Sequence, residues 1–396
     1  MILLFASACD IRDSGEAATT LARDSAGIHI VENRSPAWTN GDSWTIDPHS
    51  VLQIGVLEGR EAYQFTSIWR ATRRSDGVIA LVDRGGAEVR IFGSEGEHIQ
   101  TIGREGEGPG EFGSLPEILW VAPDTLLTWD ARLRRLTWFD RGGNVVRERS
   151  MAGAISAANM RGVVGISGAW QVLPDGAFLV SGHQTGDDGG FDRYFMRFIT
   201  AEGSVASLGD YEGDQRVRVP QRVVMAHSFG PHPYAALRDQ PVAIFLARTG
   251  RREITVFDSA GRVTELWRVA VPRVPITKRV LEEELSRWAD ILQATSTPAV
   301  SGLQDAFDQL SVPDSLPAIR RVFSDPVGNL WIQRRSESDP SAEGPFDVLD
   351  PNGRWFGTVE MPQDAGRVLE IGRDYILTVW YDELRVDCLR VYQVRK

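Results

Sequence analysis

The feature that most constrains the fold is a pattern that recurs at a fixed distance along the chain. Residues 75–103 align with residues 123–150 so that Asp83 matches Asp130, and Gly96 matches Gly143. Each unit has two alternating strands, a polar loop after the Asp, a third strand ending in Phe, a turn closed by Gly, and a fourth strand. Only Gly adopts the positive φ of such a turn without steric cost. Repeated four-stranded units are typical of β-propeller blades.

Further copies of this pattern extend along the rest of the chain. The turn returns in FDSAG, LDPNG and, in weaker form, ITAEG, and second-strand signatures follow Asp175, Val242, Gly328 and Asp374. The 39 Gly and 20 Pro residues, with few long helical patterns, are also typical of β-rich proteins. The sequence therefore predicts an all-β fold, a six-bladed β-propeller with four-stranded blades.

The two ends of the repeat region complement each other. The last unit, residues 374–396, contains a second and a third strand and no fourth. Residues 51–55 (VLQIG) are a fourth strand without the preceding three. We expect this N-terminal strand to pair with residues 386–394 and close the ring, which also covers an exposed edge. The predicted domains are a lipoprotein signal remnant and polar linker over 1–27, and the propeller over 28–396.

One glycine-rich segment matches the GxGxxG pattern of dinucleotide-binding loops, from Gly108 to Gly113. Pro109 has no amide hydrogen to offer a phosphate, and the neighbouring glutamates, Glu107 and Glu111, would repel one. Residues 54–65 repeat the same arrangement of Ile-Gly, an acidic loop and Phe. We therefore predict a connector between blades, with Phe112 buried between sheets, and no cofactor.

These motifs together carry a family resemblance. The segment IGREGEGPGEF, followed by a strand, an Asp, an aromatic third strand and FDxxG, resembles the NHL-type repeat. From about residue 28 the chain resembles uncharacterised six-bladed propeller proteins found as lipoproteins in soil bacteria. The resemblance implies the fold and an envelope location. It does not imply one activity, because propellers include lyases, hydrolases and binding proteins.

Cys9 is the candidate for membrane attachment. It follows the apolar stretch MILLFASA, which resembles a bacterial lipobox, in which the Cys is lipidated after signal cleavage. No other segment has the roughly 18 apolar residues of a membrane span. The expected location is therefore the bacterial cell envelope, periplasmic or surface-exposed, with the membrane contacted only through the lipid.

Polar residues on one predicted face are the candidate ligand-binding groups. In a propeller, the connectors between blades and the loops between second and third strands share a face, where ligands usually bind. Charged pairing between neighbouring blades is the alternative role for the same side chains. The residues placed on this face are Asp83, Arg84, Asp130, Arg132, His183, Arg248, Arg251, Arg334, Arg335 and Asp382, and all of them except Arg251 and Arg335 are the main candidates for ligand binding.

A metal-dependent enzyme of the propeller lyase or lactonase kind is the alternative function. Its metal would need imidazoles from different blades, and the candidates are His183, His227 and His232. No calcium-type set of Glu, Asn and Asp recurs in the inner strands, and no GxSxG motif is present. Cys388 lies inside a strand, which predicts a buried structural thiol.

The main prediction is a monomeric binding or scaffolding protein. The net charge of -11 without a basic run argues against nucleic acid as a partner, which leaves a protein, a peptide or a small polar ligand. Residues 273–317 interrupt the repeats between the fourth and fifth blades. Thr277 is the predicted cap of a helix there, and Leu281, Leu285 and Trp288 lie at helical spacing. We expect a lid that packs on blades four and five.

Overall fold

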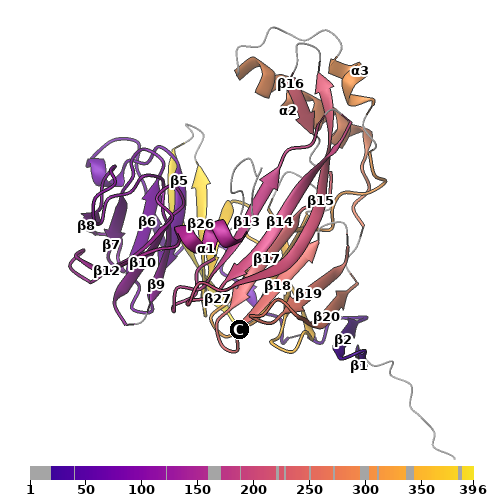
Figure 1. Ribbon diagram of the computed structural model, residues 1–396, viewed down its shortest axis with the longest axis horizontal. Helices are drawn as coiled ribbons and strands as arrows, with labels where there is room; N and C mark the ends of the chain where they lie inside the picture. The colour runs from indigo at the N-terminus through magenta and orange to yellow at the C-terminus, as the bar shows by residue number, and fades with distance from the viewer. Residues whose placement is uncertain are drawn as a thin grey trace, which may run out of the picture.

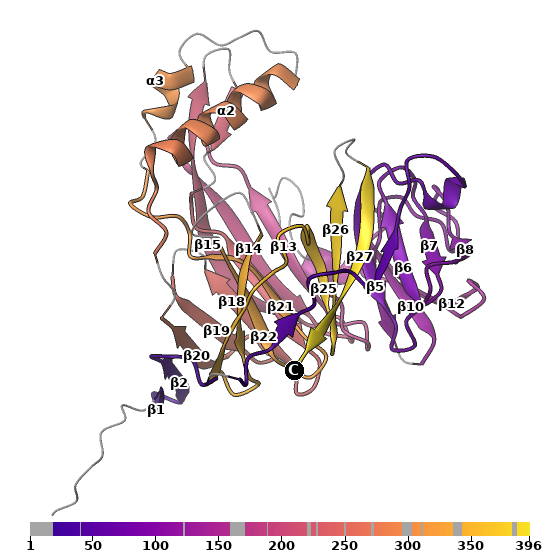
Figure 2. The ribbon, with the colours of Figure 1, turned by 180° about the vertical axis from the view of Figure 1, so that it is seen from behind.

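A computed structural model describes residues 19–39, 41–121, 123–158, 171–187, 189–219, 223–226, 229–248, 251–270, 273–294, 303–309, 312–335, 343–381 and 386–396. Strands dominate, and they form six sheets of four or more strands (Figures 1 and 2). The sheets are numbered here in chain order. The predicted β-rich architecture is therefore present. Within the described residues, no helix is both long and apolar enough to span a membrane.

The first two sheets are antiparallel and follow the repeat of the sequence. The first contains β5 (Ile68–Arg73), β6 (Ile79–Asp83), β7 (Val89–Phe92) and β8 (His98–Ile102). The second contains β9 (Glu117–Val121), β10 (Thr125–Asp130), β11 (Arg135–Phe139) and β12 (Val145–Ser150). Two short helices flank these sheets, η1 (Glu61–Tyr63) and α1 (Ala152–Ala157).

The third sheet extends beyond the others. It contains β13 (Phe178–Gln184), β14 (Phe191–Ile199), β15 (Val205–Val219) and β16 (Val223–Ala226). β15 has 15 residues, and its far end pairs with β16 instead of with β14. The third sheet thus projects as an arm from the body of the protein (Figure 1).

The last three sheets contain the following strands. The fourth has β17 (Pro233–Arg238), β18 (Ala243–Arg248), β19 (Glu253–Phe257) and β20 (Val263–Val269). The fifth has β21 (Ile319–Ser324), β22 (Leu330–Arg335), β23 (Glu343–Leu349) and β24 (Trp355–Val359). The sixth has β25 (Arg367–Ile371), β26 (Tyr375–Tyr381) and β27 (Asp387–Arg395).

The repeated turn has one backbone geometry in four sheets. The register shifts at the end of the third strand, for example between Ile91 and Phe92 and between Trp138 and Phe139. The turn glycine that follows has a positive φ of 87° at Gly96 and 80° at Gly143. The fourth and fifth sheets repeat both features. A bulge followed by a left-handed glycine thus explains why Phe and Gly recur at this spacing.

The N-terminal residues add strands to two later sheets. β1 (Thr20–Ser25) and β2 (Ile28–Asn33) form a hairpin, and β2 runs parallel to β20 at the edge of the fourth sheet. Residues 20–25 are therefore a strand, and the expectation that they belong to a linker is wrong. β3 (Thr45–Ile46) and β4 (Leu52–Ile54) both pair with β27. The expected pairing between residues 51–55 and 386–394 is present.

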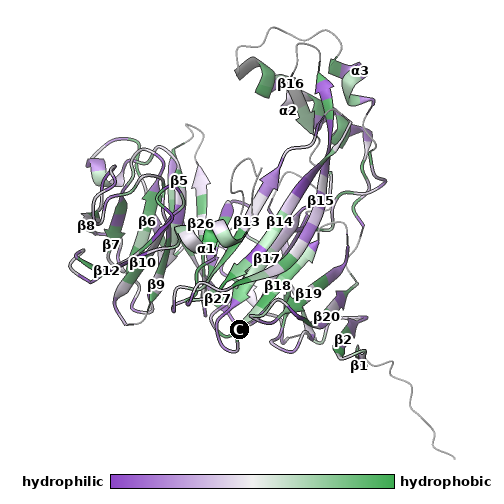
Figure 3. Cartoon of the chain, in the orientation of Figure 1, coloured by the Kyte–Doolittle hydropathy of each residue, from purple (hydrophilic) through white to green (hydrophobic). Residues whose placement is uncertain are grey.

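Six hydrophobic clusters join the sheets in order. Leu126 and Phe139 of the second sheet pack with Val82 of the first. Equivalent clusters join the second sheet to the third, and so on to the sixth. The remaining cluster joins the sixth sheet to the first, through Leu377 and Leu81. Hydrophobic residues accordingly concentrate in central strands such as β17 and β18 (Figure 3).

The helical insertion packs on the arm. It contains α2 (Lys278–Ala294) and α3 (Leu303–Phe307). The amide of Val280 donates to Thr277 Oγ1 at 3.4 Å, which confirms the predicted cap. Trp288 is fully buried against α3 and the β15 and β16 strands of the third sheet. The expectation that this stripe packs on blades four and five is therefore wrong, because the long β15 supplies the apolar surface instead.

Candidate functional site

The two repeated aspartates hold backbone connectors in place. Asp83 is almost fully buried, and its carboxylate accepts hydrogen bonds from the amides of Thr66 at 3.1 Å and Ser67 at 2.7 Å. Asp130 makes the equivalent contacts with the amides of Gly113 and Ser114, at 2.6 and 3.1 Å. Each Asp therefore fixes the segment that leads into the first strand of its own sheet. We do not retain Asp83 and Asp130 as ligand-binding groups.

The first strands of several sheets contact one another. β5 contacts both β9 and β25, and β21 contacts both β17 and β25. Five arginines gather there. They lie in the first half of these strands, soon after the connectors, or on the adjoining strand β22. This arginine cluster consists of Arg70 on β5, Arg320 and Arg321 on β21, Arg335 at the end of β22, and Arg367 at the start of β25.

The guanidinium groups of this cluster are close enough to repel one another. Burial lowers the pKa of Arg321, and the charges of Arg320 and Arg70 lower it further, although Glu343 acts against them. Burial also lowers the pKa of Arg367, and the charges of Arg321 and Arg70 add to this. Burial and the charge of Arg320 likewise lower the pKa of Arg335. All these groups remain cationic at neutral pH, because an arginine pKa starts above 12.

Glu343 and Glu117 are carboxylates that contact arginines of this cluster. Glu343 Oε1 lies 3.7 Å from Nη2 of Arg320 and 3.8 Å from Nη1 of Arg321. Glu117 accepts a hydrogen bond from Nε of Arg70, and burial raises its pKa. Nη1 of Arg321 is buried without a hydrogen-bond partner in the described structure. A buried donor of this kind is unfavourable unless a ligand or a water molecule accepts its hydrogen bond.

Arg84 extends the arginine cluster toward solvent. Its guanidinium lies 4.2 Å from the ring centroid of Trp69, and that of Arg70 lies 4.3 Å from the same ring. Arg84 is exposed and Arg70 is half-buried. Trp69 therefore holds two cations beside each other through cation–π contacts. Arg84, which was proposed from the sequence, is thereby connected to the arginine cluster.

Aromatic and histidine rings of the third and fourth sheets continue from the arginine cluster. Burial raises the pKa of Tyr234, and the nearby charges of Arg321 and Arg335 act against this. The ring centroid of Tyr234 lies 6.4 Å from that of His232. Tyr194 is 5.2 Å from His232 and 5.0 Å from His183, measured between centroids. These four residues, Tyr234, His232, Tyr194 and His183, are called the aromatic wall below. They present flat surfaces next to a cationic region.

Each histidine of the aromatic wall is paired with an aspartate. His183 Nε2 lies 3.1 Å from Asp192 Oδ2, and His232 Nε2 lies 2.8 Å from Asp214 Oδ2. Arg216 binds Asp192 through two hydrogen bonds of 2.7 and 2.6 Å. Burial alone would raise the pKa of Asp192. Hydrogen bonds from Arg216 and Gly186 act against burial, and the pKa of Asp192 is lowered. Asp192 therefore remains ionised and fixes the His183 ring.

Helix α2 contributes charges to the same region. Glu284 is buried, and it accepts two hydrogen bonds from Arg287 on the next turn. The charge of Glu284 acts on Arg335, and that of Asp214 acts on Arg287. The helical insertion therefore lies near both the arginine cluster and the aromatic wall.

The other residues proposed from the sequence have separate roles or lie elsewhere. Arg132 is exposed and donates to the carbonyl of Gly113 at 3.2 Å. Arg248 lies over the ring of Tyr211 at 5.3 Å. Arg334 Nε is 3.1 Å from the buried Asp347 Oδ2, whose pKa burial raises. Cys9, His227 and Asp382 lie outside the described residues.

The predicted metal alternative gains no ligand set from the geometry. His183 and His232 flank Tyr194 and are each held by an aspartate. Across the described ranges, no three His, Cys, Asp or Glu residues gather in a way that would hold a metal ion. Cys388 is buried beside the carbonyl of Gly55, as expected for a structural thiol.

A cavity of about 640 Å³ opens at the other ends of the first strands. Its lining includes Arg73, Glu370 and Tyr375. Burial raises the pKa of Glu370, although hydrogen bonds from Thr72 and Tyr375 and from the amide of Arg73 act against this. Glu117 also lines this cavity, so the Arg70–Glu117 pair stands between it and the arginine cluster.

Sequence reasoning placed Arg335 on this face but missed the other four residues of the arginine cluster. Arg320 and Arg321 are adjacent, so they give no alternating signal, and Arg70 lies in a strand with no repeated motif. The signal that could have found them is the position of each arginine within its strand. Arginines at the starts of several first strands converge because those strands contact one another in the fold.

Comparisons with known proteins find only distant likeness. No protein-family model matches the chain, and no curated protein sequence is similar to it. A member of the DUF4221 family from Bacteroides vulgatus is 11% identical with a TM-score of 0.46, over 89% of this chain and 99% of that one. Virginiamycin B lyase from Staphylococcus aureus is 10% identical at 0.39, over 89% and 100%. A gluconolactonase from Xanthomonas campestris is 12% identical at 0.38, over 88% and 100%.

Proposed function

We propose that the six sheets are the blades of a six-bladed β-propeller closed by β4 on β27, and that the protein binds a small anionic ligand at one mouth of its central channel. The arginine cluster is the binding site, and the aromatic wall forms one side of it. The protein acts as a monomeric binding module and not as an enzyme. The ligand carries a carboxylate or phosphate group and a flat part that packs on Tyr234 and His232.

The observation that carries this proposal is the environment of Arg321. Its Nη1 is buried without a hydrogen bond in the described structure, next to the like charges of Arg320 and Arg70. Such crowding is unfavourable in the unliganded fold and becomes favourable when an anion bridges the guanidinium groups. Groups that destabilise the free protein and stabilise a complex are typical of functional sites.

We also propose an envelope location. The segment MILLFASA followed by Cys9 supports attachment through a lipid on the cysteine. The β1–β2 hairpin begins only about ten residues after Cys9, so the propeller would lie near the membrane surface. Cys9→Ser should release the protein from the envelope fraction of a bacterial host, whereas wild type should label with palmitate. Equal fractionation of both forms would remove this part of the proposal.

The binding site can be tested with a panel of simple anions. Citrate, malonate and inorganic sulfate are titrated calorimetrically at low ionic strength, with glycerol as the neutral control. At least one anion should bind saturably and weaken as salt is added, because screening reduces charge attraction. Arg321→Gln should weaken that binding by about 10- to 100-fold, the loss of one charge-assisted hydrogen bond.

Arg373→Gln is the matched control for this experiment. It removes the same charge from an exposed position in the turn between β25 and β26, on the opposite side of the sixth sheet. This variant should bind the anion as wild type does. Arg321→Gln should also melt no lower than wild type without anion, because it relieves a crowded buried charge. Absence of saturable binding to the whole panel, or equal weakening in both variants, would refute the proposed function.

A further inference from the structure

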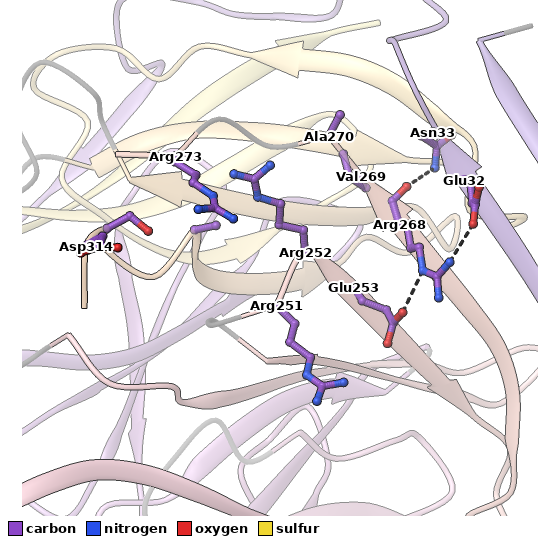
Figure 4. Close-up of a pocket in the computed structure, with 12 residues that line it drawn as sticks. Glu32, Asn33, Arg251, Arg252, Glu253, Arg268, Val269, Ala270, Arg273 and Asp314 are labelled. Carbon is purple, nitrogen blue, oxygen red and sulfur yellow. Dashed lines mark hydrogen bonds and ion pairs between the residues drawn. The ribbon is translucent and has the colours of Figure 1, made fainter. Parts of the chain in front are cut away.

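A second cavity lies on the outside of the ring. It has a volume of about 790 Å³ and is formed where β2, the β18–β19 loop and the residues before β21 meet. Figure 4 shows its lining residues, which include Arg251, Arg252 and Arg273. This volume falls in the range of small-molecule sites, about 300–1,000 Å³. None of its lining residues belongs to the arginine cluster or the aromatic wall.

Most of the negative charge in this cavity is already engaged. Arg268 donates to Glu32 Oε1 at 2.7 Å and to Glu253 Oε2 at 2.9 Å, and Figure 4 shows these three side chains together at one end. These contacts lower the pKa of Glu32, with the hydrogen bond from Arg268 as the main cause. Glu32 is therefore ionised, and both carboxylates are engaged mainly by Arg268 within this group.

Three arginines remain without a partner in the cavity. The guanidinium groups of Arg251, Arg252 and Arg273 make no hydrogen bond or ion pair with any residue in the described ranges. Arg252 and Arg273 extend toward the same part of the cavity, where no dashed contact is drawn (Figure 4). Asp314 is the one further carboxylate of the lining. Three cations against one anion leave a positive region within a concave surface.

We propose that this cavity binds a phosphate ester of a polyol, of the size of a sugar phosphate. Arg252 and Arg273 would bind the phosphate, because planar guanidinium forks match its oxygens in pairs. Asp314 at one end, and Glu253 at the other, would accept hydrogen bonds from hydroxyl groups of the polyol. A bare inorganic anion fills little of a cavity this large, so the organic part of the ligand contributes to binding.

The phosphate ester has two possible sources, which share this chemistry. It is either a soluble metabolite or the headgroup of a phospholipid. Glu32 and Asn33 of the cavity belong to β2, in the hairpin that follows the N-terminal segment. The cavity therefore lies beside the part of the chain that would lead to a membrane anchor. Glucose 6-phosphate in solution and vesicles of phosphatidylcholine with phosphatidylinositol distinguish the two sources.

The experiment measures binding of glucose 6-phosphate by calorimetry, with glucose and inorganic phosphate titrated separately. Glucose 6-phosphate should bind at least about tenfold more tightly than either fragment, because both ends of the cavity are then used. Co-flotation with phosphatidylinositol vesicles, in excess of pure phosphatidylcholine vesicles, would assign the headgroup source. Flotation without an effect of the arginine variants would count against the cavity as the site.

Three variants make the result specific. Arg252→Gln and Arg273→Gln should each weaken glucose 6-phosphate binding about tenfold or more, the effect of losing a charge-assisted hydrogen bond. Arg373→Gln, which removes a charge elsewhere, should have no effect. Arg321→Gln should also leave this binding unchanged, so failure here is separable from failure of the channel-mouth proposal. Equal affinity in wild type and both cavity variants, with unchanged circular dichroism, would overturn the inference, and so would equal affinity for glucose 6-phosphate and glucose.

Discussion

Ile54 lies directly opposite Leu389 in the antiparallel pairing of β4 with β27, and both side chains are buried in the cluster that joins the sixth sheet to the first. If this pairing closes the ring, Ile54→Ala should lower the free energy of unfolding by about 2–4 kcal/mol, as buried large-to-small substitutions do. Chemical denaturation measures the change. Val51→Ala is the control, since Val51 is 62% exposed, and should change stability by less than about 0.5 kcal/mol. Similar values for both variants would indicate that β4 does not hold the ring.

Phe112 tests the connector interpretation of the glycine-rich segment. Its side chain is buried, and its ring centroid is 6.0 Å from that of Phe139. The amides of Gly108 and Gly110 already donate to carboxylates, at 2.8 Å to Glu111 and 3.2 Å to Glu148, so they do not offer a phosphate cradle. Phe112→Ala should cost about 3–5 kcal/mol in denaturant unfolding. Saturable dinucleotide binding by wild type, lost in Gly110→Ala, would contradict this interpretation.

The helical insertion should open independently of the sheets. Trp288 belongs to a cluster made by the arm and the insertion, and this cluster shares no residue with the six that join the sheets. Trp288→Ala should therefore speed amide hydrogen exchange in residues 278–294, with little change in residues 126–130. The increase should correspond to a loss of about 3–5 kcal/mol of local stability. Ala289→Gly, at an exposed position of the same helix, gives the control for helix propensity alone. A uniform rise across the sheets would show that the insertion is part of the same cooperative unit.

Glu370 makes stability depend on pH in a defined direction. Its folded pKa is raised by burial, so the folded state holds the proton more tightly than the unfolded state. As pH rises from the ordinary glutamate value near 4.3, the unfolded chain loses this proton first, and stability falls until the folded pKa is passed. Glu370→Gln should therefore flatten the pH dependence above about pH 4 in chemical denaturation. Glu95→Gln, at an exposed position in the turn between β7 and β8, is the control and should leave the slope as in wild type.

An unchanged slope in Glu370→Gln would mean that the buried carboxyl is ionised in the folded protein. The difference between wild type and variant is the useful quantity, because Glu117 and Asp347 also have raised pKa values and contribute to the wild-type profile.

Features that repeat were the ones that the sequence predicted well. The positive-φ glycines, the buried Phe112 and the partnership between residues 51–55 and β27 follow from local turn chemistry and from counting strands. The β1–β2 hairpin was missed because its polar sequence, TLARDS, reads as linker. Its pairing depends on the edge of β20, more than 200 residues later, which no local pattern reveals.

The candidate site was predicted less well for a related reason. Arg84, proposed from the sequence, lies beside the arginine cluster. Asp83 and Asp130 recur because each fixes the connector of its own sheet, so recurrence signalled a structural role. Residues of the arginine cluster such as Arg321 and Arg367 occur once each, and their convergence exists only after distant strands have assembled.

The long reach of the N-terminal segment has a consequence for synthesis. Asn33 accepts a hydrogen bond from the amide of Trp355 at 2.9 Å, Trp38 stacks on Phe356, and Ile54 pairs with Leu389. β3 and β4 are translated long before β27, the strand with which both of them pair. Any nascent chain that stalls before residue 387 therefore keeps these two strands available to chaperones or to export machinery.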